Sequence, residues 1–169
     1  MFDSLVLGVD PGLARLGLAV VGREGRRPVL VWSQTVQTPA DMPEPLRLRA
    51  VADAVRAAIA AQGPSSVAIE RVAFNRNQVS ALTVARATGA VMVVAADAGL
   101  PVDEYSPTEV KSVVTGAGNA DKAQVREALT RMHGLRDVPL QADAVDAVAI
   151  ALTHLTGARL RAAARTGSR

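Results

Sequence analysis

The stretch Leu5-Val6-Leu7-Gly8-Val9-Asp10-Pro11-Gly12 is an apolar, partly β-branched run that ends in an acid and a turn. It predicts a buried strand with Asp10 at its C-terminal end. Two more apolar runs, residues 16–21 and 29–36, follow, with a glycine-containing turn at 22–25 between them. This spacing predicts that the chain begins with an antiparallel meander of three strands.

The rest of the chain alternates between helical patterns and short strands. Apolar residues at helical spacing predict helices at 43–62, 78–98, 121–133 and 141–156. Short apolar runs predict strands at 66–70 and 101–105. Ser106-Pro107-Thr108-Glu109 predicts a capping box that opens a further short helix, which carries Lys111. Strand hairpins followed by alternating helices and strands predict an α/β fold, with a mixed five-stranded sheet and helices on both faces.

Composition limits the chemistry that this chain can perform. It has 169 residues, 49% of them hydrophobic, and only four aromatic residues, so one domain with an aliphatic core is expected. The absence of cysteine excludes disulfides, a thiolate zinc site and thiol catalysis. The longest apolar run, residues 90–96, is far too short to cross a membrane, and the N-terminus lacks the basic flank of a secretion signal. We therefore expect a cytoplasmic protein without membrane partners.

The formal charge of +3 is unevenly distributed. Residues 158–169 hold four arginines and no acid, which leaves 15 basic against 16 acidic residues in 1–157. We expect residues 1–157 to form the single domain and 158–169 to be a basic, flexible tail. Because the tail alone accounts for the basic balance, the charge is weak evidence for a polyanionic partner.

Four acids stand out because of their surroundings. Asp10 and Glu70 each end a predicted buried strand, and Asp143 and Asp146 lie three residues apart on one face of the last helix. If the two strands are neighbours, four carboxylates converge into a site suited to a hard cation such as Mg²⁺ or Mn²⁺. Each acid could instead be an ordinary surface residue: Asp10 could begin a turn, and Asp143 could interact with the helix dipole. Neither alternative explains Glu70 or Asp146.

Five segments of the chain form an ordered set of motifs: Gly8-Val9-Asp10-Pro11-Gly12, Ala68-Ile69-Glu70-Arg71-Val72, Tyr105-Ser106-Pro107-Thr108-Glu109-Val110-Lys111, Asp121-Lys122-Ala123-Gln124-Val125 and Ala142-Asp143-Ala144-Val145-Asp146-Ala147. Together they cover about residues 4–156 and resemble the motifs of the RuvC family of crossover junction endodeoxyribonucleases, in the same order. The first motif alone is weak, because ribonuclease H-like and sugar-kinase-like folds share it. The set is highly specific.

The resemblance implies a fold, an activity and partners. The fold is ribonuclease H-like, and the enzyme is a homodimer that resolves four-way (Holliday) junctions in homologous recombination and DNA repair. Two Mg²⁺ or Mn²⁺ ions per active site would hydrolyse the phosphodiester, and paired symmetric nicks would leave 5′-phosphate and 3′-hydroxyl ends. A branch-migration helicase complex of the RuvA and RuvB type is the implied partner.

The resemblance also assigns residues. Asp10, Glu70, Asp143 and Asp146 fall on the family's metal-binding acids, although some relatives have histidine at the last position. Lys111 and Lys122 match basic residues of the family near the scissile phosphate. They are the only lysines among the 19 basic residues of the chain, and a lysine supplies a compact point charge where an arginine would supply a planar group.

Further DNA contacts are expected from the segment after Glu70. They comprise Arg71, Phe74, Arg76 and Asn77, with Phe74 stacking on an unpaired base. Aligning Asn77 with the family places Ala73 where many relatives carry the aromatic, with Phe74 one residue later. The alternative is that Phe74 anchors its loop to the core or to the dimer partner. Arg86 is a further candidate phosphate contact.

Several other features have a structural interpretation. We interpret His133 and His154 as structural residues. The loop at 116–120 could present backbone amides to phosphate, or Gly116 could simply cap the preceding helix. The predicted helix at 78–98 is apolar around more than one stripe, and we expect it to form the dimer contact.

The sequence offers two alternatives to the nuclease, each from a different function class. A junction-binding architectural module without catalysis is the main alternative, and the presence of all four acids argues against it. A nucleotide-binding, kinase-like domain suggested by Asp10-Pro11-Gly12 fails because that fold needs a second lobe, for which the chain is too short.

Overall fold

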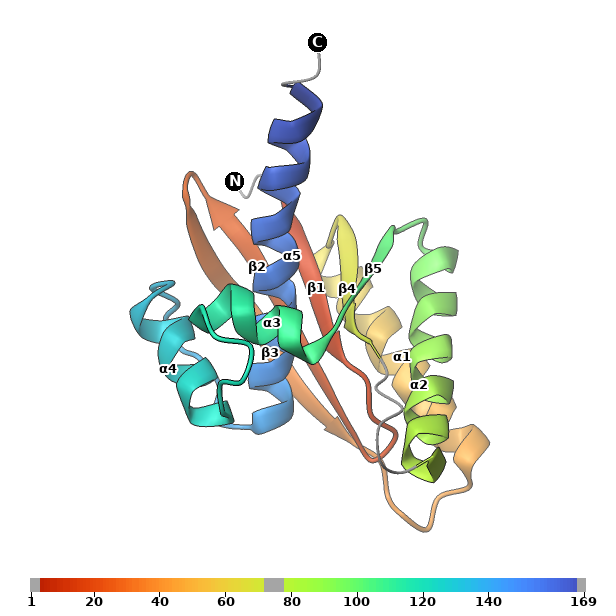
Figure 1. The fold of residues 1–169 in the computed structure, drawn as a ribbon. Helices are drawn as coiled ribbons and strands as arrows, with labels where there is room; N and C mark the ends of the chain where they lie inside the picture. The colour runs from red at the N-terminus through yellow and green to blue at the C-terminus, as the bar shows by residue number, and fades with distance from the viewer. Residues whose placement is uncertain (1–3, 72–77, 167–169) are drawn as a thin grey trace.

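A five-stranded mixed sheet forms the centre of the molecule, as predicted (Figure 1). The computed structural model describes residues 4–71 and 78–166. The strand order is β3-β2-β1-β4-β5, with bounds Leu5–Asp10 for β1, Arg15–Glu24 for β2, Arg27–Gln37 for β3, Ser66–Glu70 for β4 and Val102–Tyr105 for β5. β1, β2 and β3 pair antiparallel, whereas β4 pairs parallel with both β1 and β5. The first three strands therefore form the predicted meander.

Helices cover both faces of the sheet (Figure 1). Their bounds are Glu44–Gln62 for α1, Gln78–Asp97 for α2, Pro107–Thr115 for α3, Lys122–Arg131 for α4 and Ala142–Thr166 for α5. One buried cluster joins the sheet to α3, α4 and α5, and a second joins the other face to α1 and α2. Both clusters consist mainly of valine, leucine and alanine, because the chain has few aromatic residues to bury.

Local capping sets the start and end of the short helices. Ser106 and Glu109 form the predicted capping box of α3, and Gly116 ends α3 in the left-handed conformation at φ 80°. The capping interpretation of Gly116 is therefore confirmed. Asp121 and Gln124 form a second capping box at the start of α4. No helix in the part of the chain that the structure describes is both long and apolar enough to span a membrane.

The structure corrects two predicted boundaries. The turn between β2 and β3 is narrower than 22–25, because β2 continues to Glu24 and the positive φ of 58° falls on Gly25. β2 also carries a register irregularity at Val20/Val21. α5 continues to Thr166, so its backbone is helical through most of the segment expected to be a flexible tail (Figure 1). That segment contains alanine, leucine and arginine and no proline, and these residues favour a helix.

Candidate active site

Asp10 and Glu70 lie at the same end of the sheet because β1 and β4 run parallel. Val9 pairs with Ile69, so the next residue on each strand is the acid. Side chains alternate between the two faces of a sheet, and Leu7, Val9, Val67 and Ile69 belong to the cluster on the α1–α2 face. Asp10 and Glu70 therefore point to the opposite face, which α5 covers.

Two glycines let the first turns of α5 approach that face closely. A Cβ atom on Gly8 would overlap the carbonyl oxygen of Ala147, and one on Gly17 would overlap the carbonyl oxygen of Asp143. Gly17 pairs with Asp10 across β1 and β2. The start of α5 thus lies against the end of β1, which places Asp143 and Asp146 beside Asp10.

The two strand acids, Asp10 and Glu70, both have raised pKa values. Burial, and then repulsion by Glu70, Asp146 and Asp143, raises the pKa of Asp10 to about 7. Burial and the charge of Asp146 also raise the pKa of Glu70, against the lowering effect of Lys122 and Lys111. Both shifts therefore include repulsion from carboxylates on other elements, in addition to burial.

Two cations contact the carboxylates of α5. Lys122 Nζ donates a hydrogen bond of 2.8 Å to Asp146 Oδ2, and this bond raises the pKa of Lys122. Arg15 Nε lies 3.1 Å from Asp143 Oδ2. Lys111, on α3, is half-buried and acts on Glu70 through its charge.

The donor set fits a hard divalent cation in its chemistry. All four groups are carboxylates, and a divalent cation would offset both the burial and the repulsion that raise the pKa of Asp10. Within residues 4–71 and 78–166, no three acidic or histidine side chains stand close enough together to hold a metal ion as they are. Asp143 and Asp146 instead contact Arg15 and Lys122.

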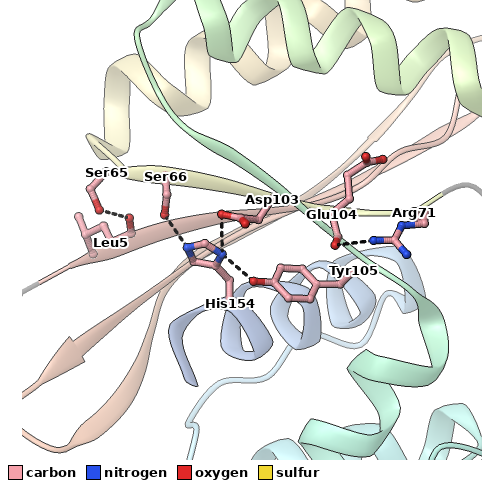
Figure 2. Close-up of polar contacts among 8 residues, drawn as sticks. All are labelled: Leu5, Ser65, Ser66, Arg71, Asp103, Glu104, Tyr105 and His154. Atoms are coloured by element: carbon pink, nitrogen blue, oxygen red, sulfur yellow. Dashed lines mark hydrogen bonds and ion pairs between the residues drawn. The ribbon is translucent and has the colours of Figure 1, made fainter. Parts of the chain in front are cut away.

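Of the other residues expected to contact DNA, Arg71 and Arg86 have other partners, and the rest fall outside the described residues. Arg71 is exposed, and its guanidinium lies 3.4 Å from the carbonyl oxygen of Glu104 (Figure 2). Arg86 forms an ion pair of 2.6 Å with Glu44, which links α2 to α1. Three predicted DNA contacts fall outside the described residues: Phe74, Arg76 and Asn77.

Both histidines have contacts that agree with a structural role. His154 is buried between α5 and the sheet, 3.2 Å from Ser66 Oγ and 3.0 Å from the Tyr105 hydroxyl, with Asp103 at 3.6 Å (Figure 2). His133 Nε2 lies 2.8 Å from the carbonyl oxygen of Val114. The first histidine ties α5 to β4 and β5, and the second ties the end of α4 to α3.

Sequence reasoning missed three residues that shape the site. Gly8 and Gly17 each interrupt an apolar strand, and an isolated glycine there is a recognised signal of close backbone approach. Arg15 had no comparable signal, because its partner Asp143 is distant in sequence.

A mixed sheet of this order, with acids from β1, β4 and α5 meeting at one end, defines the ribonuclease H-like class of fold. The family model described as crossover junction endodeoxyribonuclease RuvC matches residues 6–154. The chain belongs to this RuvC family, and it is a crossover junction endodeoxyribonuclease. Members of the family generally use divalent metal ions.

Relatives and a solved structure agree with this assignment. The chain is 49% identical to the crossover junction endodeoxyribonuclease RuvC of Frankia alni, over 94% of this chain and 83% of the relative. It is 44% identical to that of Leifsonia xyli, over 96% and 79% of the two chains. The solved structure of Thermus thermophilus RuvC in complex with a Holliday junction substrate superimposes with a TM-score of 0.86 at 36% identity, covering 94% of this chain and 96% of the other.

Proposed function

We propose that this enzyme resolves four-way DNA junctions by paired, symmetric hydrolysis of phosphodiester bonds, with two Mg²⁺ or Mn²⁺ ions in each active site. The single observation that carries the proposal is the half-enclosed position of Asp10, where burial and then repulsion by three other carboxylates, Glu70, Asp146 and Asp143, raise its pKa to about 7. Such an arrangement is unfavourable without a cation and is suited to binding one. The junction as substrate is supported by the Thermus thermophilus complex.

Each site residue has a proposed role. Asp10, Glu70, Asp143 and Asp146 would hold the ions, which would activate a water and stabilise the leaving 3′-oxygen. Attack by water with loss of the 3′-oxygen leaves a 5′-phosphate and a 3′-hydroxyl.

The lysines and the segment after Glu70 would bind the DNA. The charges of Lys111 and Lys122 already act on the acids that would hold the ions. A scissile phosphate bound at those ions would therefore lie near both lysines, which would neutralise part of its charge. The DNA strand would be bound beside them by Arg71, Phe74, Arg76 and Asn77.

Symmetric nicking needs two active sites, and we propose a homodimer that contacts through α2. Leu82 and Val93 are 52% and 61% exposed. They are about three helical turns apart and therefore lie on one side of α2. Leu82→Glu should convert a dimer to a monomer in sedimentation; an unchanged dimer would exclude this contact. Delivery of junctions by a branch-migration helicase complex of the RuvA and RuvB type is part of the same proposal.

The test uses the full-length protein with a synthetic four-way junction. We expect symmetric nicks with Mg²⁺ or Mn²⁺, no cleavage with chelator, and no cleavage of a linear duplex of the same sequence. Asp10→Asn should bind the junction without cleaving it. Asp53→Asn is the matched control, because Asp53 is an exposed acid on α1 that pairs with Arg56.

Two results would contradict the proposal. Full activity of Asp10→Asn would exclude the acid site, and binding without cleavage under every metal condition would favour the architectural module.

A further inference from the structure

Arg15 is a cation at the acid site to which the family resemblance assigns no role. It is the first residue of β2, and its Nε atom lies 3.1 Å from Asp143 Oδ2. The Arg15 side chain is 56% exposed, whereas that of Asp143 is only 22% exposed. The arginine is thus the partner with more freedom to move away.

The fold explains why Arg15 reaches this acid. Arg15 and Gly17 are two residues apart on β2, so both face α5. Gly17 lies directly against the backbone of Asp143, and Arg15 extends from the end of the same strand to its carboxylate. Lys122 contacts Asp146 from α4. The two acids of α5 therefore each have a cation, one from the sheet and one from a helix.

We propose that Arg15 is a counter-ion that changes partner: it neutralises Asp143 in the metal-free enzyme, and it binds a DNA phosphate beside the cleaved bond once a divalent cation takes the Asp143 carboxylate. This inference rests on the proposed function. A divalent cation and a guanidinium compete for the same oxygens, and an ion pair with one side exposed is weak enough to be displaced. The released guanidinium has a planar fork of donors that suits phosphate oxygens.

The first measurement is metal binding by the full-length protein without DNA. Mn²⁺ is titrated, and the rise in Tm reports binding. Because Arg15→Gln removes the competing cation, we expect the Mn²⁺ midpoint to fall about two- to fivefold. Arg56→Gln is the matched control: Arg56 is 57% exposed and pairs with Asp53 on α1 at 2.7 Å, and its loss should leave the midpoint unchanged.

The second measurement is junction cleavage at saturating Mn²⁺. Arg15→Gln should raise KM for the junction about three- to tenfold with little change in kcat, since one phosphate contact is lost. The dependence of log KM on log salt concentration should become shallower by about one. Arg15→Lys keeps the charge and should retain most of that salt dependence.

Both shifts are required. An unchanged Mn²⁺ midpoint for Arg15→Gln, or an unchanged KM, would overturn the proposal. If the wild-type protein neither binds Mn²⁺ nor cleaves the junction, the proposed function has failed and this proposal falls with it. If the wild type does both and Arg15→Gln behaves identically, only the role of Arg15 is refuted.

Discussion

Gly17→Ala should impair cleavage more than its effect on stability explains. The added Cβ would overlap the carbonyl oxygen of Asp143 and lie 3.2 Å from the backbone nitrogen of Ala144, so the start of α5 must move away from β2 by about 1 Å. Overpacking of this kind costs about 1–3 kcal/mol of unfolding free energy. A displacement of about 1 Å at reacting groups costs about 10²-fold in rate.

The assay compares Tm and junction cleavage for Gly17→Ala and a matched glycine variant. For a chain of this length, we expect Tm to fall by about 2–4 °C per kcal/mol. Gly25→Ala is the control: Gly25 has a φ of 58° and open space around it, so alanine costs about 1–2 kcal/mol in backbone strain at the far end of β2. It should lose comparable stability and keep its activity.

Two outcomes would refute this reasoning. If Gly17→Ala keeps wild-type cleavage and Tm, α5 does not depend on the close approach at Gly17. If both variants lose activity in proportion to Tm, the loss reflects general destabilisation and not displacement of Asp143.

Three other predictions concern charge and capping. Because burial and neighbouring carboxylates raise the pKa of Asp10 from 3.8 to about 7, the folded metal-free protein binds a proton more tightly than the unfolded chain does, and this group destabilises the fold increasingly as pH rises from about 4 to 7. The Tm of Asp10→Asn minus that of the wild type, both in chelator, should therefore be more positive at pH 8 than at pH 5; a difference independent of pH would contradict the raised pKa. Lys122→Gln removes a charge that lowers the pKa of Asp10 and Glu70, so the onset of Mn²⁺ binding should move to higher pH; an unchanged onset would exclude this coupling. Asp121→Ala removes the N-cap of α4 and should cost about 1 kcal/mol, seen as a lower midpoint in urea, whereas an unchanged midpoint would show that the cap contributes nothing.

The sequence predicted those parts of the site that follow from periodicity. Apolar runs ending at Asp10 and Glu70 placed both acids at strand ends, and the three-residue spacing of Asp143 and Asp146 placed both on one helix face. The parallel pairing of β1 and β4 then brings the strand acids together, as expected for neighbouring strands. The positions of the acids on their strands and helix depend on local geometry, which a single chain segment encodes.

Two features that the sequence did not predict have different physical causes. α5 runs past Thr156 because its last residues favour a helix on their own, whereas their positive charge indicates a solvated tail. Gly22 resembled a turn residue, yet it pairs with Leu5 inside the sheet, where pairing outweighs its preference for turns.

The ion pairs of Asp143 and Asp146 offset a repulsion between carboxylates that arises only when the chain folds. Gly8 and Gly17 hold the start of α5 against a strand that ends in an acid, so the close packing also forces carboxylates together. Without a cation, that repulsion opposes folding, and Arg15 and Lys122 offset part of it at two of the four acids. Asp10 has no ion-pair partner among the described residues, and burial together with the neighbouring carboxylates raises its pKa to about 7. The charged form of this carboxylate is therefore disfavoured at the end of the strand that opens the sequence.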